Sequence, residues 1–391
     1  MTSHSDRLAG IEVWLAGLAA PGTGTVLIMD RTASARSLHR SLATATGPAL
    51  VLGPTGRPYR PPTGWDLVAR YGVFGPVSEP QWLVRLDLPG ARAWFADSVR
   101  PAWGLPGRVA RRLGRWPAAA RWAFHGTAAL LVPEDGPRDR WAGPAGLTGP
   151  AGPPIALATG TGATSGRLVI SYGDPTGRPA RHVKLGPVGQ ARPLRSEREV
   201  LVRLAGTPGV PAAAGTASNE VWYASGQDHL PGVSLQRHWS GGVDRIPGIA
   251  AVLDWLATTT APRGLVHGDL WPANVLLGPA GIGVVDWEAA GPGDPLLDAV
   301  FFLVTADPAA DADPVAATVR ALTAPAAGAG LGRLLAATGR PGLAGAELRT
   351  ELLAALTTIA ARSGPGGRPD PDRRSRWLAG RDALAAAGQR P

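Results

Sequence analysis

The sequence predicts an α+β protein built from three consecutive parts. Residues 1–133 show a strand–helix–strand order, which is typical of a small α/β unit. Residues 155–230 contain short apolar or alternating runs separated by glycine-rich turns, which indicates β-strands. Residues 231–391 are rich in alanine and leucine at helical spacing, which indicates a helical region.

The first part is expected to be a separate α/β domain of unknown role. Thr25–Asp30 and Ala49–Leu52 are apolar runs typical of strands, and Ser34–Leu42 between them has a helical pattern. No phosphate-binding glycine fingerprint follows the first strand, so the sequence assigns no function here. The Gly- and Pro-rich residues 134–154 are expected to form the linker to the second part.

Arginine is concentrated between residues 100 and 121, in a chain whose formal net charge is +9. Such a region can form a surface for an anionic ligand or partner, although an Arg run is also typical of one solvated helix face. No nucleic-acid-binding motif accompanies it, so we expect no nucleic-acid partner.

The absence of cysteine excludes a disulfide framework and thiol chemistry. The first residues lack a basic segment followed by a long apolar core, so we expect no signal peptide. No uncharged apolar run is long enough to span a bilayer. We therefore expect a cytoplasmic protein without a membrane span.

A glycine-rich turn opens the second part, between predicted strands at Ile155–Ala158 and Arg167–Tyr172. Backbone N–H groups in such a turn, here around Gly160 and Gly162, can approach phosphates closely. An ordinary hairpin shows the same pattern, so the turn alone does not decide between the two interpretations.

Lys184 is the one lysine among 39 basic residues, and the other 38 are arginines. Arginine stands at nearly every position where either basic residue would serve. This indicates that Lys184 has a role that arginine does not fill. A compact ammonium on a flexible stem suits a phosphate-binding role that a planar guanidinium does not fill easily. Alternation along the predicted strand Arg181–Leu185 places Lys184 on the face opposite Val183 and Leu185.

A helix is predicted at Leu194–Leu204, with Val200, Leu201 and Leu204 as its apolar stripe. Glu197 lies four residues before Leu201, on the same helical face, and is the favoured candidate for a functional glutamate on this helix. Glu199 is the alternative candidate.

The most informative stretch is Val266–Leu277, followed by Gly283–Glu288. Two apolar runs flank a Gly-Pro-Ala-Gly turn, which predicts a short hairpin. That hairpin would bring Asn274 and Asp286 together with Asp269 in the preceding loop. Three oxygen-bearing side chains in one small volume suit Mg²⁺ and the activation of a hydroxyl group.

This stretch resembles the catalytic and metal-binding loops of the aminoglycoside phosphotransferase and choline kinase family. The resemblance is carried by His267-Gly268-Asp269-Leu270, by Asn274, and by Asp286-Trp287-Glu288. It implies a two-lobed protein-kinase-like fold, with a small β-rich N-lobe and hinge at residues 155–230 and a helical C-lobe at residues 231–391.

The resemblance also implies roles for the individual residues, with ATP and Mg²⁺ as cofactors. Lys184 would hold the nucleotide phosphates and pair with Glu197, under the turn that contains Gly160 and Gly162. Asp269 would take the proton of the acceptor hydroxyl, and Asn274 and Asp286 would coordinate Mg²⁺. His267 and Asp298 would support the loop. Glu288 would contact a second metal or the substrate.

The resemblance implies a kinase that transfers the γ-phosphoryl group of ATP to a hydroxyl of a small molecule, such as a sugar derivative, an amino alcohol or an antibiotic-like compound. Two alternatives stay open. One is a non-catalytic kinase-fold module that binds nucleotide or docks a partner. The other is a protein Ser/Thr kinase, which the lack of a recognisable activation segment after Asp286 makes the weaker alternative.

Overall fold

The structure is a computed structural model, and it describes residues 11, 25–28, 40–45, 47–54, 61–74, 81–85, 87–98, 126–135, 147, 154–159, 167–240, 242–310, 312–362 and 371–387. The chain divides into two compact units, residues 1–194 with 213–229, and residues 195–212 with 230–391. The predicted Arg-rich surface at 100–121 and the glycine-rich turn with Gly160 and Gly162 lie outside the described residues. None of the described helices is both long enough and apolar enough to cross a bilayer.

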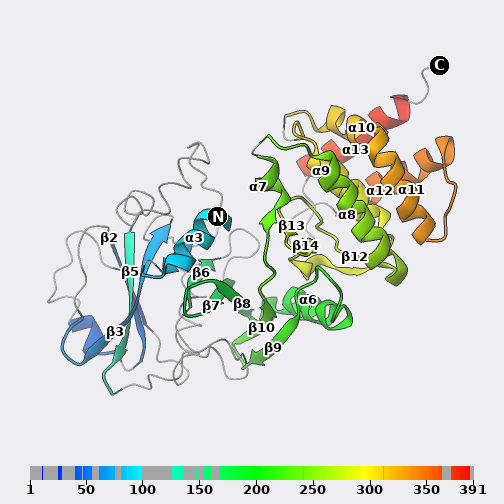
Figure 1. Ribbon diagram of the computed structural model, residues 1–391. Helices are drawn as coiled ribbons and strands as arrows, with labels where there is room; N and C mark the ends of the chain where they lie inside the picture. Colours follow the sequence, from blue (N-terminus) through cyan, green and yellow to red (C-terminus); the bar gives the residue numbers. More distant parts are fainter. Residues whose placement is uncertain are drawn as a thin grey trace. The chain divides into compact units, whose positions relative to one another are not determined.

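The first unit is built on one sheet, which has ten strands in the described residues (Figure 1). The strand order is β1-β2-β5-β3-β4-β6-β7-β8-β10-β9. Only β1 and β2 pair in parallel among these strands, which fits the expected strand–helix–strand unit. The strands are β1 (Thr25–Ile28), β2 (Ala49–Pro54), β3 (Trp65–Phe74), β4 (Trp82–Arg85), β5 (Gly126–Pro133), β6 (Ala156–Thr159), β7 (Leu168–Gly173), β8 (Pro179–Pro187), β9 (Ala213–Ser218) and β10 (Trp222–Asp228).

This sheet runs without a break across the boundary that the sequence suggested at residue 133. β4 pairs antiparallel with β6, with Trp82 opposite Ala158 and Val84 opposite Ala156. One buried cluster contains Leu52 from β2, Leu157 from β6 and further residues up to β10. Leu147, within the predicted linker, is buried in the same cluster. A separate N-terminal domain is therefore not confirmed, and its boundaries stay a prediction.

Strand β8 separates apolar from polar side chains, as its alternation predicts. Val183 and Leu185 are fully buried in the core cluster, whereas His182 and Lys184 are half-buried on the opposite face. The short 3₁₀ helix η2 (Val188–Gln190) follows β8, and helix α6 (Arg192–Arg203) comes after it. Helix α3 (Pro89–Ser98) packs against β4 and β8.

The second unit is mainly helical, as the sequence predicts. Its helices are α7 (Leu235–Trp239), α8 (Ile246–Thr259), α9 (Leu296–Ala306), α10 (Pro314–Thr323), α11 (Pro325–Ala337), α12 (Gly345–Arg362) and α13 (Pro371–Ala387), with the 3₁₀ helices η3 (Ala261–Arg263) and η4 (Trp287–Ala289). Its short strands are β11 (Val233–Ser234), β13 (Val275–Gly278) and β14 (Gly281–Val284) in one sheet, and β12 (Leu265–Val266) and β15 (Gly291–Pro292) in another.

Helix α9 is the centre of this helical unit. Nine of its eleven residues are buried, and it contacts α8, α10, α11 and α12 (Figure 1). A helix that is apolar on all sides is stable only inside a protein, which explains this position. Asp298 in its first turn is the one charged residue of the helix, and it is also buried.

The packing of α11 on α8 offers a test with a matched control. A Cβ added at Gly330 would lie 2.3 Å from Leu253 Cδ1 and 2.9 Å from Leu253 Cβ, whereas a Cβ at Gly332 would meet nothing within 4 Å. We expect Gly330→Ala to lower the free energy of unfolding by about 1–3 kcal/mol through overpacking. Gly332→Ala should raise it by about 0.5–1 kcal/mol, because alanine favours the helix. Chemical denaturation measures both, and equal effects would contradict this packing.

Candidate active site

The predicted hairpin is present and holds two of the predicted site residues at its ends. β13 and β14 pair antiparallel, with Val275 opposite Val284. Asn274 directly precedes β13, and Asp286 lies two residues after β14. The Val285 N–H also donates to the Asn274 carbonyl oxygen at 3.0 Å, so the pairing continues by one residue toward both side chains.

The loop before the hairpin is held by the buried carboxylate of Asp298. His267 N–H donates to Asp298 Oδ2 at 2.5 Å, and Gly268 N–H donates to Asp298 Oδ1 at 2.9 Å. Gly268 has a φ of +83°, and a Cβ there would lie 2.4 Å from the Ala289 carbonyl oxygen, so only glycine fits. Each carboxylate oxygen thus accepts one backbone N–H, as a role in loop support requires.

Opposing effects act on the pKa of the Asp298 carboxyl group. Desolvation by burial raises its pKa to about 6, while the N–H groups of His267 and Gly268 act in the opposite direction. The charge of Arg362 also lowers the pKa, and that of Asp269 raises it. The carboxylate is therefore ionised at neutral pH and becomes protonated in mild acid.

Both ring nitrogens of His267 hydrogen-bond to the backbone. Nε2 lies 3.0 Å from the Val285 carbonyl oxygen, which can only accept, so Nε2 carries the proton. Nδ1 then accepts from the Asp269 N–H at 3.3 Å. The ring also lies against Trp287, with centroids 4.7 Å apart. The fully buried side chain of His267 thus joins the loop to the end of β14.

Asp269 and Asn274 are linked within the same loop. Asn274 Nδ2 donates to the Asp269 carbonyl oxygen at 3.0 Å, which directs the amide nitrogen toward the loop. Its Oδ1 is then the atom left to act as a ligand. The Asp269 side chain is half-buried. Amide and carboxylate oxygens, the donor types of Asn274 and Asp286, are ligands that Mg²⁺ prefers.

Asp286 adopts a backbone conformation that few residues adopt. Its φ is +68°, the one positive φ of a non-glycine residue in the part of the chain that the structure describes. Asp tolerates this region at some energetic cost, and such outliers cluster at functional sites. The next residue, Trp287, is fully buried, and its N–H donates to Glu197 Oε1 at 3.1 Å.

The two candidate glutamates of α6 differ in exposure. Glu197 is 2% exposed, whereas Glu199 is exposed. The hydrogen bond from Trp287 N–H places Glu197 directly beside the segment that contains Asp286 and Glu288. Glu288 itself is half-buried in the 3₁₀ helix η4.

Lys184 belongs to the first unit, on β8. It lies opposite Val169 of β7 and Ser225 of β10, in the middle of the sheet. Its charge is close enough to His182 to help lower the pKa of that histidine.

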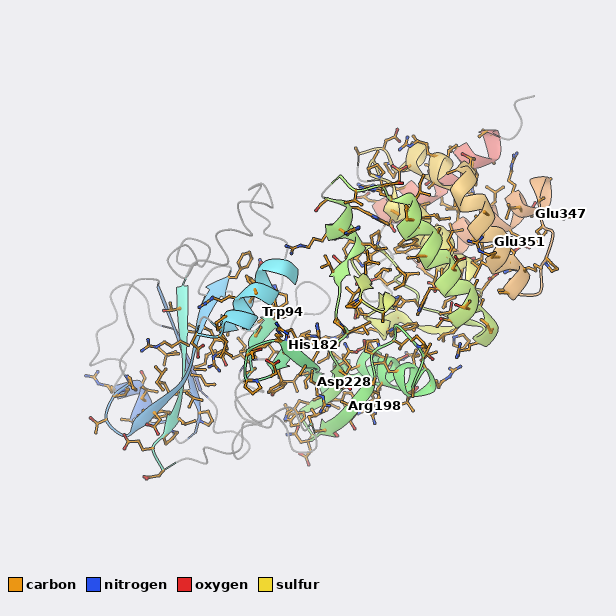
Figure 2. All side chains as sticks on the ribbon, in the orientation of Figure 1. Trp94, His182, Arg198, Asp228, Glu347 and Glu351 are labelled. Atoms are coloured by element: carbon orange, nitrogen blue, oxygen red, sulfur yellow. The ribbon has the colours of Figure 1, made fainter. Side chains whose placement is uncertain are left out.

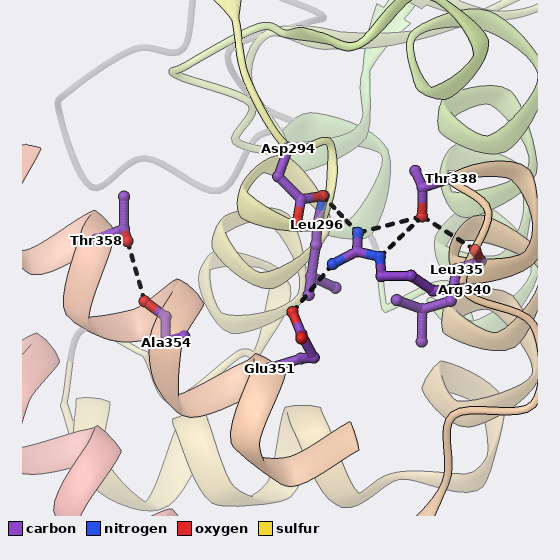
Figure 3. A network of polar contacts seen from close by, with 8 residues as sticks. All are labelled: Asp294, Leu296, Leu335, Thr338, Arg340, Glu351, Ala354 and Thr358. Carbon is purple, nitrogen blue, oxygen red and sulfur yellow. Dashed lines mark hydrogen bonds and ion pairs between the residues drawn. The ribbon is translucent and has the colours of Figure 1, made fainter. Parts of the chain in front are cut away.

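The sequence did not identify the polar contacts that anchor the start of α9. Asp294 Oδ1 accepts from Leu296 N–H at 2.9 Å and from Arg340 Nη2 at 2.7 Å, and Arg340 Nη1 donates to Glu351 Oε2 at 3.0 Å (Figure 3). These bonds tie the turn before α9 to α12. Nothing in the sequence indicated Arg340 as the partner of Asp294.

The pKa of Asp298 generates a pH-dependent prediction. In the unfolded chain an aspartate titrates near pH 4, and in the folded protein this one titrates at about 6. Between these values the folded state binds a proton that the unfolded state lacks. The contribution of Asp298 to the free energy of unfolding therefore falls as pH rises through this window, by up to about 3 kcal/mol.

Asp298→Asn does not titrate and offers one oxygen for two N–H donors. The stability lost in this variant should be largest below pH 4 and should shrink as the pH rises to 7. Denaturation of both proteins across this range measures the difference, and a constant difference would contradict the assignment.

Comparison with known proteins gives one family match. Residues 154–335 match the model of the phosphotransferase enzyme family, abbreviated APH. A search among curated proteins found no significant match. A solved structure, the aminoglycoside phosphotransferase APH(3'')-Id from Streptomyces rimosus, matches with 15% sequence identity and a TM-score of 0.31, over 56% of this chain and 90% of that chain.

The family match includes Lys184, Glu197 and the whole stretch from His267 to Asp298. It confirms the family resemblance that the loop motifs indicated. Residues 154–335, just under half of the chain, are thus similar to the phosphotransferase enzyme family.

Proposed function

We propose that this protein is an ATP-dependent kinase that transfers the γ-phosphoryl group to a hydroxyl of a small molecule. The observation that carries the proposal is the arrangement of the loop and hairpin. Asp269, Asn274 and Asp286 lie on two short segments whose backbones are held together by hydrogen bonds from His267, Asn274 and Val285. Phosphoryl transfer depends mainly on such positioning and on charge neutralisation.

Asp269 is the group that orients the acceptor hydroxyl and takes its proton. Its own N–H donates to His267 Nδ1, and the two preceding N–H groups donate to Asp298, so the backbone that carries its carboxylate is held in place. His267 is excluded as the base, because Nε2 and Nδ1 are both engaged by backbone groups. Its role is to hold the loop, as is that of Asp298.

Four residues are assigned to the nucleotide phosphates. Lys184 is assigned to the α- and β-phosphates, and the buried Glu197 is assigned to hold it in place. Gly160 and Gly162 are assigned to cover the phosphates through their backbone N–H groups. Asn274 Oδ1 and Asp286 would hold Mg²⁺, which when bound neutralises the phosphate charge. Glu288 is assigned to a second metal or to the acceptor.

The acceptor is a hydroxylated small molecule, such as a sugar derivative, an amino alcohol or an antibiotic-like compound. The test is incubation of the protein with γ-labelled ATP, Mg²⁺ and a panel of such compounds, followed by separation of labelled products. Labelled product from at least one compound is the expected result. Tight ATP·Mg²⁺ binding without transfer to any compound would favour the non-catalytic module instead.

Asp269→Asn tests the assignment of the base. The variant should lower kcat by about 10²–10⁴-fold, because proton transfer to a positioned base contributes rate enhancement of this order. The KM for ATP should change little. Asp254→Asn is the matched control, since Asp254 is exposed on α8 and pairs with Arg333. Retention of kcat in Asp269→Asn would contradict the proposed mechanism.

A further inference from the structure

The candidate active site contains an exposed aromatic side chain that the proposed mechanism does not use. Trp271 lies two residues after Asp269, so the Cα atoms of these residues are at most about 7 Å apart. Trp271 is 38% exposed. Among the tryptophans whose side chains the structure describes, it is the one that is exposed, and the others are buried or half-buried.

The backbone of Trp271 is tied to both neighbouring site residues. Its N–H donates to the Asp269 carbonyl oxygen at 3.1 Å, and its carbonyl oxygen accepts from the Asn274 N–H at 2.9 Å. Pro272 follows and disfavours a helical backbone at Trp271. The Pro272 carbonyl oxygen also accepts from the Gln236 N–H of α7 at 3.0 Å. The indole is therefore carried by a backbone that is fixed relative to Asp269.

The indole ring lies on the solvent side of this loop. The side chains of Leu270 and Pro272, which flank Trp271 in the sequence, are both buried, whereas Asp269 is half-buried. Within the described part of the chain, the indole contacts no other aromatic ring and its Nε1 donates to no acceptor. An open aromatic surface beside a proposed base is the kind of surface that lines ligand sites.

The flat face of an indole suits a sugar ring. The hydroxyl groups of a pyranose project mainly from its rim, so part of each ring face consists of C–H groups. The face of an aromatic ring carries partial negative charge that attracts these C–H groups, and stacking removes apolar surface from water. The indole N–H can also donate to a sugar oxygen. An open-chain alcohol offers no such flat face.

A quaternary ammonium acceptor fits this surface less well. Proteins bind such a cation in a cage of several aromatic rings. The structure buries the other tryptophans and phenylalanines of the second unit, which are Trp239, Trp255, Trp287, Phe301, Phe302 and Trp377. The described residues of this unit therefore supply one open ring, which is enough for a stack but not for a cage.

An acceptor with several positive charges would need free carboxylates. Glu351 lies on α12 (Figure 2), where it pairs with Arg340, and Asp294 pairs with the same arginine. Asp254 of α8 pairs with Arg333. These carboxylates are compensated within the protein, so they do not form a site for several positive charges, and a neutral acceptor is favoured.

We propose that Trp271 forms one wall of the acceptor subsite and that the acceptor is a neutral cyclic sugar, which stacks a C–H face on the indole and presents a hydroxyl to Asp269. The inference rests on the proposed function, which assigns Asp269 to that hydroxyl. It selects neutral sugars from the acceptor classes named there. Trp271 determines specificity by binding the ring and takes no part in proton transfer.

The test measures transfer from γ-labelled ATP with Mg²⁺ by the full chain to matched pairs of compounds. Each pair is a neutral hexopyranose and its open-chain polyol: glucose with sorbitol, galactose with galactitol, and mannose with mannitol. Choline and kanamycin represent cationic acceptors. We expect kcat/KM for at least one hexopyranose to exceed that for its polyol and for both cations at least about tenfold. Preference for a polyol, choline or kanamycin would overturn the inference.

Trp271→Ala tests the role of the indole. Loss of the stacking surface should raise the KM for the preferred sugar at least about tenfold, whereas kcat and the KM for ATP should stay within about twofold. Trp271→Phe keeps an aromatic face and should keep the KM for the sugar within about threefold of that of the unmodified protein. An unchanged KM in Trp271→Ala, or an equal rise in both variants, would overturn the inference.

Ile246→Ala is the matched control, because Ile246 is another exposed apolar residue of the second unit, at the start of α8. It should leave all three constants unchanged. A fall in kcat or a rise in the KM for ATP in Trp271→Ala would show that Trp271 only holds the loop, which also overturns the inference. Transfer to choline or kanamycin without transfer to any hexopyranose would leave the proposed function intact. If no compound is labelled, the proposed function fails with the inference.

Discussion

The geometry of the candidate active site depends on two hydrogen bonds from the loop backbone to one buried carboxylate. Asp298 accepts the N–H groups of His267 and Gly268, and hydrogen bonds to a charged group stabilise by about 1.5–3 kcal/mol each. A charged group can be kept in this interior only because these donors compensate part of its lost hydration. The helix that carries Asp298 is apolar on its other sides, so its position is fixed by packing.

Further hydrogen bonds connect this loop and the end of β14 to other segments of the chain. His267 connects the loop to the end of β14 through the Val285 carbonyl oxygen, and Trp287 connects the next segment to Glu197. Asp269 and Asp286 are each within two residues of one of these contacts, and Asn274 hydrogen-bonds to the backbone of Asp269 and Val285. The site is therefore held by backbone hydrogen bonds on rigid segments, an arrangement suited to a reaction in which positioning contributes most of the rate enhancement.

Local patterns predicted local structure well. The Gly-Pro-Ala-Gly turn between two apolar runs predicted the β13–β14 hairpin, and alternation predicted that Lys184 lies on the face opposite Val183 and Leu185. The family resemblance implied that Asp298 supports the loop, and the structure supplies its two donors. The assignments of Asn274 and Asp286 to a metal stay predictions.

Contacts between distant segments were not predictable in the same way. The apolar run at Ile155–Ala158 predicts a strand there but not its pairing with β4, and this pairing joins the first region to the strands that follow residue 154. The hydrogen-bonded His182–His229 pair joins residues 47 positions apart, and no local pattern marks it. The contact between Arg340 and Asp294 was not predictable for the same reason. Sequence spacing alone identifies candidate functional residues. The pairing of distant segments decides which of these residues come into contact.

Asp298 holds the loop that contains Asp269 through the N–H groups of His267 and Gly268. Amide hydrogen exchange in the unmodified protein and in Asp298→Ala tests it most directly. The account predicts that the His267 and Gly268 amides are protected and lose this protection in the variant, while the amides of the β13–β14 hairpin stay protected. Fast exchange at His267 and Gly268 in the unmodified protein, or unchanged protection in the variant, would contradict it.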